Sequence, residues 1–390
     1  MPTKVLIAGA GVAGLEAALA LRALGEDRLA VELVSPETEF VYRPLAVAEP
    51  FRMGEARRFP LRLLAEAAGA ELTRASVRSV DDAHYMIITS DGDAMRYDAL
   101  LLALGARAVP SIPGALTFKG PGDERSFGHL LDDARSGDVR RLVFALPTGA
   151  SWPLPLYELA LLTAVHLADA GAAVELTLVT PEERPLQLFG DTASKAVAEL
   201  LEQHKITIYT DTTAVSVEDG ALRILPDNRI EADRVVALPR LEGPRLEGVP
   251  HDTNGFVPTD AHGVVRGLVD VYAAGDLTDF PLKQGGIATQ QADAAAESIA
   301  AAAGAPIEPR AFTPVLRGLL LTGLTPRYLR TEPRSVRSAA DTEPLWWPPA
   351  KIVGRHLAPF LANQLHVSES PPPAAGDAVA VDVDLRAQVP

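Results

Sequence analysis

Ala8-Gly9-Ala10-Gly11-Val12-Ala13-Gly14 decides the fold of this chain, because its glycines have the spacing of a dinucleotide-binding turn. Residues 4–8 before it predict a buried strand, and the apolar periodicity after it predicts a helix. In such a turn Gly9 permits the bend, Gly11 lets the backbone approach a diphosphate, and Gly14 lets the helix pack on the strand. The amides and the positive dipole end of the helix would face the diphosphate.

A second predicted strand, residues 30–34, leads to the position where this kind of fold usually places an acid for the ribose hydroxyls. The chain has Ser35 there, followed by Pro36, with Glu37 and Glu39 just beyond. Ser35 fits the register better, and Glu37 remains the alternative. The absence of an acid at this position weakens any case that the nucleotide bound here is NAD.

The segment Val271-Tyr272-Ala273-Ala274-Gly275-Asp276, far along the chain, predicts an apolar strand that ends in an acid. The Asp276 carboxylate can accept a hydrogen bond from a sugar-alcohol hydroxyl. An alanine-rich helix follows, and the amides at Gly286 and Ile287 would stabilise the negative charge of a reduced flavin. Lys283 could add a full positive charge, or it could be a solvated lysine in a loop.

These motifs resemble those of two-dinucleotide-domain flavoproteins, the pyridine nucleotide-disulfide oxidoreductase superfamily. Within it, the chain is most similar to the sulfide:quinone oxidoreductase and type II NADH dehydrogenase branch. The resemblance is carried by the glycine turn and by Val41–Leu45, Tyr97–Ala106 and Asp270–Asp276. It implies an α/β fold with two Rossmann-like dinucleotide-binding domains, the second inserted in the first, plus a C-terminal segment at the flavin face.

The same resemblance implies FAD as the cofactor, with Asp276 holding its ribityl chain. The Leu100–Leu104 run predicts a central strand ended by Gly105, which suits a backbone pressed against a cofactor. The candidate cofactor-binding residues are Gly9, Gly11, Ala13, Gly14, Ser35, Pro36, Arg43, Pro44, Val77, Ala103, Leu104, Gly105, Gly275, Asp276, Lys283, Gly286 and Ile287.

The domain organisation follows from these motifs and from the length of 390 residues. We expect an FAD-binding domain at 1–115 and 255–305 and a second, degenerate nucleotide-binding-like domain at 116–254. A C-terminal flavin-capping or interface segment is expected at 306–367, and the proline-rich composition predicts a flexible tail at 368–390.

The second domain repeats the strand-turn-helix pattern from about Arg141, but its turn lacks the glycine fingerprint. The turn is Pro147-Thr148-Gly149-Ala150-Ser151-Trp152-Pro153-Leu154-Pro155, in which prolines remove amide donors and Trp fills space. NADH is therefore only weakly supported as a cofactor. NADPH is supported still less, because Thr180-Pro181-Glu182 after the next strand lacks an Arg or Lys cluster for a 2′-phosphate.

Aligned on Tyr157 and Glu158, the resemblance places the family's cysteine at Trp152. Trp152 could pack against the flavin ring, or it could be a hydrophobic plug. Glu158 could relay a proton to a reduced quinone, or it could be an ordinary carboxylate at a helix start. The candidate catalytic residues are Glu158, Lys283 and Trp152.

Composition excludes several classes of function. The net charge of -15 argues against nucleic acid as a partner. With no cysteine, the chain cannot carry out disulfide exchange or cysteine-mediated sulfide oxidation, nor hold a cysteine-ligated cluster. The 8 histidines show no metal-ligand spacing, so we predict no metal site.

Nothing in the sequence resembles an export signal or an apolar stretch long enough to span a bilayer, which favours a cytoplasmic protein. Residues 315–323 predict a hairpin strand packed on the FAD domain. Residues 345–361 predict a helix preceded by Trp346 and Trp347. In one interpretation this helix meets a membrane surface, with Lys351, Arg355 and His356 in the headgroup layer; intramolecular packing or a homodimer contact is favoured.

The sequence thus predicts an FAD-dependent oxidoreductase that passes electrons from a small donor to a quinone or another acceptor. The most concrete version is a reaction like that of a type II NADH dehydrogenase, against which the degenerate second turn counts. The alternative is a non-catalytic FAD-binding protein with a structural, sensing or partner-binding role and a closed second site.

Overall fold

The first sheet joins the N-terminal strands to a strand from much later in the sequence. Its order is β20-β9-β1-β2-β5, and all neighbours are parallel. The strands are β1 (Thr3–Ala8), β2 (Leu29–Val34), β5 (Glu71–Thr73), β9 (Ala99–Leu102) and β20 (Val271–Ala273). Parallel strands end at the same edge of a sheet, so the pairing of β20 with β9 brings Asp276 to the turn after β1.

The second sheet repeats this arrangement, with order β11-β18-β12-β13-β14 and parallel neighbours throughout. Its strands are β11 (Leu116–Thr117), β12 (Arg141–Ala145), β13 (Glu175–Val179), β14 (Ile206–Tyr209) and β18 (Arg234–Ala237). The whole sheet is built from residues that lie between β9 and β20 of the first. This confirms the predicted fold class, an α/β protein with one Rossmann-like domain inserted in another.

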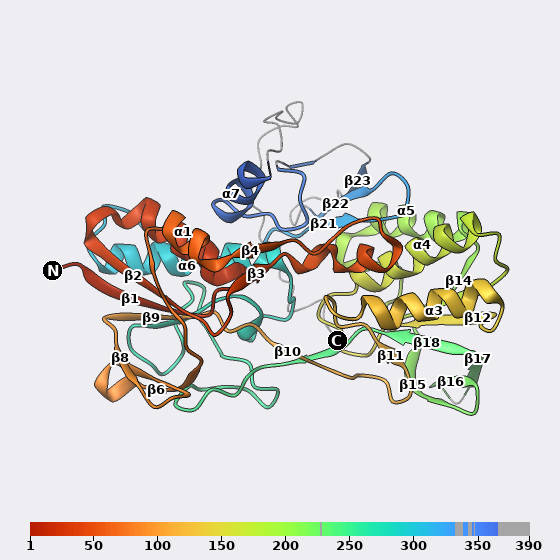
Figure 1. The fold of residues 1–390 in the computed structure, drawn as a ribbon, viewed down its shortest axis with the longest axis horizontal. Coiled ribbons are helices and arrows are strands. Elements are labelled where there is room, and N and C mark those ends of the chain that lie inside the picture. The colour runs from red at the N-terminus through yellow and green to blue at the C-terminus, as the bar shows by residue number, and fades with distance from the viewer. Residues whose placement is uncertain (227, 332–337, 342–344, 347, 366–390) are drawn as a thin grey trace.

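The computed structural model describes residues 1–226, 228–331, 338–341, 345–346 and 348–365. The two parallel sheets lie at opposite ends of an elongated molecule (Figure 1). The helices are α1 (Val12–Gly25), α2 (Leu61–Ala67), α3 (Glu124–Ser136), α4 (Leu154–Asp169), α5 (Asp191–Gln203), α6 (Gly285–Ala302) and α7 (Leu357–Gln364). Helices α1 and α6 pack against each other and against one face of the first sheet, and α4 lies in the core of the second.

Smaller elements complete the two lobes. Three-stranded antiparallel sheets are formed by β6 (Val77–Asp81), β7 (Met86–Thr89) and β8 (Ala94–Arg96), and by β15 (Thr213–Glu218), β16 (Ala221–Leu225) and β17 (Asn228–Glu231). Strand β3 (Glu39–Val41) pairs with β4 (Arg58–Pro60), and β10 (Arg107–Val109) pairs with β19 (Arg240–Glu242) where the chain crosses between the lobes. Single turns of helix are η1 (Glu26–Arg28), η3 (Asp82–His84), η4 (Gln187–Phe189) and η5 (Gly275–Leu277), and a longer one is η2 (Arg43–Phe51).

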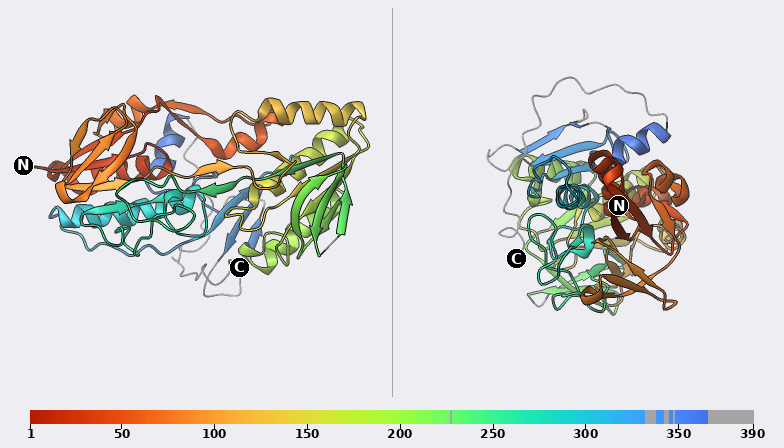
Figure 2. Two further views of the ribbon diagram at one scale, coloured as in Figure 1. Left: turned by 90° about the horizontal axis from the view of Figure 1, so that it is seen from below. Right: turned by 90° about the vertical axis from the view of Figure 1, so that its left-hand side faces the viewer.

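The C-terminal segment crosses from one lobe to the other. It contains the antiparallel strands β21 (Arg317–Leu320), β22 (Arg327–Thr331) and β23 (Ser338–Asp341), followed by α7. Seen along the long axis, these elements lie on one side of the molecule (Figure 2). Leu320 and Leu329 belong to the core around α4, whereas Leu357 and Leu361 belong to the core around α1 and α6.

Two predictions about this segment need correction. The hairpin expected to pack on the FAD domain packs mainly on α4 of the second lobe, because its leucines complete that core. The helix expected over 345–361 begins only at Leu357, because Pro348, Pro349 and Gly354 interrupt the stretch before it. Trp347 and the predicted flexible tail at 368–390 lie outside the described residues.

Within the part of the chain that the structure describes, none of the helices combines the length and the apolar character that crossing a bilayer requires.

Candidate active site

A single cavity of about 870 Å³ begins where β1, β9 and β20 end and continues to the N-terminus of α4. Its walls contain most of the candidate cofactor residues. Those on the wall are Gly9, Gly11, Ala13, Ser35, Pro36, Arg43, Pro44, Val77, Ala103, Leu104, Gly105, Gly275, Asp276 and Lys283. The three candidate catalytic residues, Trp152, Glu158 and Lys283, line the same cavity. The fold therefore brings residues from both lobes to one continuous space.

The glycine turn has the geometry of a diphosphate cradle. Gly9 has a φ of +107°, and a Cβ there would lie 2.3 Å from the carbonyl oxygen of Ala103. A Cβ at Gly14 would lie 1.9 Å from the carbonyl oxygen of Gly9, whereas a Cβ at Gly11 would meet nothing within 4 Å. Gly14 thus permits close packing, and Gly11 opens onto the cavity.

The N-terminus of α1 offers free hydrogen-bond donors to that space. No side chain caps the helix. The amides of Gly11, Val12 and Ala13 donate no hydrogen bond to any described residue. Unused amides and the helix dipole together favour an anionic ligand, so this end of the cavity fits a diphosphate.

Ser35 and Glu37 both lie on the cavity wall. The Ser35 hydroxyl accepts a hydrogen bond of 3.2 Å from the Glu37 amide, and Ser35 is buried while Glu37 is exposed. Either side chain could meet a ribose hydroxyl in this arrangement. The preference for Ser35 therefore stays a prediction.

Asp276 stands where β20 has ended, and its carboxylate accepts no hydrogen bond from a described residue. Burial raises the pKa of Asp276, and the charges of Lys283 and Arg43 oppose that rise. A half-buried acceptor that lines a cavity without a partner fits a ligand hydroxyl group. This is the arrangement that a ribityl chain needs.

Lys283 is only 7% exposed, which contradicts the alternative of a solvated loop lysine. Its Nζ donates to the carbonyl oxygen of Thr278 and lies 3.9 Å from the centroid of the Phe256 ring. Burial lowers the pKa of Lys283 to about 8, against the opposing charge of Asp276. The residue therefore brings a buried, titratable positive charge to the cavity wall.

Gly14, Gly286 and Ile287 do not line the cavity. The expected contribution of the Ile287 amide is wrong, because the Gln284 side-chain oxygen accepts its hydrogen bond at 2.9 Å and caps α6. The Ile287 side chain is buried in the core. Gln284 and Gly285, at the start of α6, line the cavity instead. The pair Gly285-Gly286 was the only sequence signal for this position, since Gln is not a favoured capping residue.

The end of the cavity near α4 contains a buried ion pair. Glu158 is fully buried, and Lys351 Nζ lies 2.6 Å from each of its two carboxylate oxygens. The Leu321 amide also donates to Glu158, at 2.8 Å. Burial raises the pKa of Glu158 and lowers that of Lys351, so the proton affinities of the two groups approach each other.

Lys351 was missed as a site residue. Its side chain is 7% exposed and lines the cavity, which contradicts the less favoured interpretation that places it in a membrane headgroup layer. No local pattern could have revealed the pairing, because 193 residues separate the two partners along the chain.

Trp152 and other apolar side chains form the remaining walls of this end. The Trp152 ring packs edge-on against Phe189, with 5.8 Å between centroids. This contact is compatible with both interpretations of Trp152, as a wall of the ring site and as a plug. Its apolar neighbours on the wall include Ala46, Val47, Phe118, Leu154 and Leu319.

The turn of the second lobe lacks the usual amide cradle for a nucleotide. Pro153 precedes α4 and Pro155 lies in its first turn, so two of the amides at this helix start are missing. Glu182 follows β13, where a ribose-binding acid would stand. One carboxylate oxygen, Oε2, accepts hydrogen bonds from the hydroxyls of Tyr157 at 2.6 Å and Thr180 at 2.9 Å. The other, Oε1, is buried without a hydrogen-bond partner among the described residues.

No group of three or more His, Asp or Glu side chains within the described ranges is arranged to hold a metal ion.

Comparison with known proteins agrees with these features. Residues 3–144 and 158–298 match the family model described as pyridine nucleotide-disulphide oxidoreductase. Apoptosis-inducing factor 3 of Mus musculus is 29% identical over 296 residues, which cover 72% of this chain and 46% of that protein. The chain therefore spans about half the length of this relative.

Two further comparisons bear on the fold. The ferredoxin–NAD(+) reductase subunit of the benzene 1,2-dioxygenase system of Pseudomonas putida is 27% identical over 317 residues, covering 73% of this chain and 70% of the relative. The sulfide:quinone oxidoreductase of Aquifex aeolicus superimposes with a TM-score of 0.79 at 19% identity, over 87% of this chain and 86% of that chain. These matches confirm the superfamily that the glycine motifs indicated.

Proposed function

Because the chain belongs to the pyridine nucleotide-disulphide oxidoreductase family, we propose that it is an FAD-dependent oxidoreductase whose acceptor is a quinone or a similar planar carbonyl compound. Members of this family use FAD together with NAD(P)H, and an oxidoreductase role agrees with the family as a whole. The observation that carries the finer proposal is the buried pair of Glu158 and Lys351 at the apolar end of the cavity.

In this proposal, residues on the cavity wall would bind three parts of FAD. The amides at Gly11 and Ala13 would hold the diphosphate, Ser35 or Glu37 the ribose, and Asp276 the ribityl chain. Bound FAD would supply the redox chemistry itself. The buried charge of Lys283 would favour the negatively charged, reduced form of the flavin.

The acceptor end has the chemistry that a quinone requires. Its apolar walls, which include Val47, Trp152 and Leu319, suit a flat carbon skeleton. Reduction of a quinone to a quinol takes two electrons and two protons, of which bound reduced flavin would supply both electrons and one proton. Lys351 donates a hydrogen bond to Glu158 at the cavity wall, and burial lowers the pKa of Lys351, so this pair can supply the other proton. The pair is therefore suited to protonate an acceptor oxygen.

The test is the reoxidation of photoreduced holoprotein by a soluble quinone without oxygen. We expect Glu158→Gln to slow reoxidation by about 100-fold, because a positioned acid is lost, and to leave flavin content unchanged. Glu199→Gln, on the exposed face of α5, is the matched control and should behave as wild type. Equal rates for wild type and Glu158→Gln would contradict the role of the pair.

The closed second turn favours a second candidate, a non-catalytic FAD-binding protein. In that case no soluble quinone, sulfide, NADH or NADPH would change the flavin spectrum of wild-type holoprotein. Rapid reoxidation by the quinone in the same experiment removes this candidate.

A further inference from the structure

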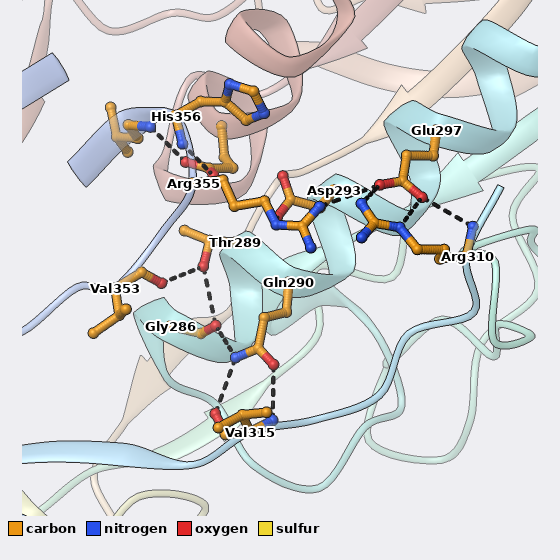
Figure 3. Close-up of polar contacts among 12 residues, drawn as sticks. Gly286, Thr289, Gln290, Asp293, Glu297, Arg310, Val315, Val353, Arg355 and His356 are labelled. Atoms are coloured by element: carbon orange, nitrogen blue, oxygen red, sulfur yellow. Dashed lines mark hydrogen bonds and ion pairs between the residues drawn. The ribbon is translucent and has the colours of Figure 1, made fainter. Parts of the chain in front are cut away.

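The chain just before α7 is fastened to the first half of α6 by hydrogen bonds (Figure 3). The Thr289 hydroxyl donates to the carbonyl oxygen of Val353 at 2.7 Å. Upstream, the Gln290 side chain donates to the carbonyl oxygen of Val315 at 3.0 Å and accepts from its amide at 2.8 Å. The Thr289 contact holds the segment that contains Lys351 beside α6, and the Gln290 contacts hold the chain before β21.

Packing in this region leaves no room for side chains at two glycines. A Cβ at Gly285 would lie 2.8 Å from Ile352 Cγ1, and a Cβ at Gly354 would lie 2.7 Å from Glu16 Oε2. The Ile352 amide donates to the Tyr42 hydroxyl at 3.0 Å. The position of residues 351–354 is therefore defined closely by α6, α1 and the chain before η2.

Glu16 of α1 provides the cap of α7. It is fully buried, and its two carboxylate oxygens accept from the amides of His356 at 2.9 Å and Leu357 at 2.7 Å. These are amides at the N-terminus of the helix, where a negative charge is most stabilising. Nearly the whole length of the chain separates the carboxylate from the helix that it caps.

Two further carboxylates, from α6, lie beside this contact (Figure 3). Arg355 approaches Glu297 at 3.3 Å and Asp293 at 3.7 Å, and Arg310 pairs with Glu297. One oxygen of Asp293, Oδ1, is buried without a hydrogen-bond partner among the described residues.

We propose that Glu16, Asp293 and Glu297 form a latch that holds residues 351–357 against the first lobe and so positions Lys351 at the acceptor end. These carboxylates are positioning residues, since they contact neither the cavity wall nor Glu158. The link to electron transfer rests on the proposed function, whereas the latch itself does not.

The latch includes a proton-binding group. Burial, followed by the nearby charge of Glu16, raises the pKa of Asp293 to about 8. The charged groups that face it are Glu16 from α1, Glu297 from α6, Arg310 from the following linker, and Arg355 from the chain before α7. Release of residues 351–357 would remove Arg355, whose charge lowers the pKa of Asp293, whereas Glu16, whose charge raises it, would stay in place on α1.

Hydrogen exchange of the holoprotein tests the latch without any assay of activity. We expect Glu16→Gln and Gly354→Ala each to raise exchange at the amides of His356 and Leu357 by about tenfold or more, because the cap is weakened or displaced. The control Glu199→Gln should leave both amides protected. Unchanged protection in both variants overturns the proposal. If one variant does not fold, the other alone decides.

Reoxidation of the reduced holoprotein by a soluble quinone then tests whether the latch affects the reaction. We expect Glu16→Gln to slow it by about tenfold, with a loss of apparent quinone affinity, through displaced Lys351. If exchange responds but reoxidation does not, the latch stands and its link to Lys351 is wrong. If wild type itself does not reduce quinone, the proposed function fails, and exchange still decides the latch.

Discussion

The two lobes carry nearly the same strand-end sequence, Ser35-Pro36-Glu37 after β2 and Thr180-Pro181-Glu182 after β13. In both, the hydroxyl of the first residue accepts from the glutamate amide, at 3.2 Å and 3.1 Å. The preceding strands also pair in register, since Ala8 is opposite Val34 and Ala145 is opposite Val179. The frames around the two turns are therefore equivalent.

The side chains at the two turns differ in what they contact. Glu37 is exposed at the cavity, whereas Glu182 accepts from the Tyr157 hydroxyl inside the second lobe. Helix α1 starts after a glycine turn, and its first amides have no hydrogen-bond partner within the described ranges. Helix α4 starts after prolines, and its Glu158 accepts a hydrogen bond from Lys351. The comparison teaches that strand order preserves the fold, while the turn decides whether a nucleotide can bind.

The largest effect is expected from the same substitution in each turn. Gly11→Asn should weaken FAD binding by about a thousandfold or more, some 4 kcal/mol, because the side chain fills the space left for the diphosphate. Gly149→Asn in the second turn should leave affinity within about twofold, since asparagine tolerates its φ of 74° and its Cβ meets nothing within 4 Å. Flavin titration of the apoprotein, with circular dichroism as a check of folding, measures both. Equal losses of FAD affinity in the two variants would contradict the contrast between the two turns.

The next effect concerns the buried ion pair between Glu158, which follows the second turn, and Lys351. Lys351→Met should lower the free energy of unfolding by about 3 kcal/mol, because Glu158 is left buried without its partner. The double variant Glu158→Gln/Lys351→Met should recover most of that stability in urea unfolding. It should not recover quinone reduction. A double variant as unstable as Lys351→Met would show that the two residues do not act as a pair.

An effect of similar size is expected at the flavin end. The Lys283 pKa of about 8 lies below its ordinary 10.5, so the folded apoprotein binds fewer protons than the unfolded chain in that window. Its free energy of unfolding should therefore rise with pH there, by about 3 kcal/mol in total. Lys283→Met should lack this rise. Urea unfolding of both proteins across the alkaline range provides the check, and parallel curves would contradict the burial of this charge.

The smallest effect is expected at the occupied acid of the second lobe. Tyr157→Phe should cost about 1 kcal/mol of stability, since a buried hydrogen bond to Glu182 is lost. Flavin content should not change, and NADH should still fail to bleach the flavin, because the prolines remain. Rapid bleaching in the variant would mean that the Tyr157 contact alone closes the site.

Much of this fold was predictable because its signals are local. The glycine turn, the apolar runs and the spacing to Asp276 indicated both sheets and most residues of the cavity wall. The capping of Ile287 by Gln284 was not predictable, since it depends on one rotamer at a helix start. Pro348, Pro349 and Gly354 were local signals for the late start of α7, but its cap by Glu16 from the other end of the chain was not predictable.

Long-range pairing is what the sequence could not supply. The sequence placed Lys351 either at a membrane surface or, as the favoured interpretation, in an intramolecular or dimer contact, but it could not identify Glu158 as the partner. Ser35 and Glu37 show the same limit, because the register after β2 favours Ser35 while both residues lie on the cavity wall.

The stoichiometry of nucleotide binding tests the contrast between the two turns most directly. Isothermal titration of apoprotein with FAD, followed by NADH on the resulting holoprotein, counts the occupied turns. We predict one FAD per chain and no heat of binding from NADH. A second bound nucleotide per chain, or an apoprotein that takes up no FAD, would contradict the assignment of the two turns.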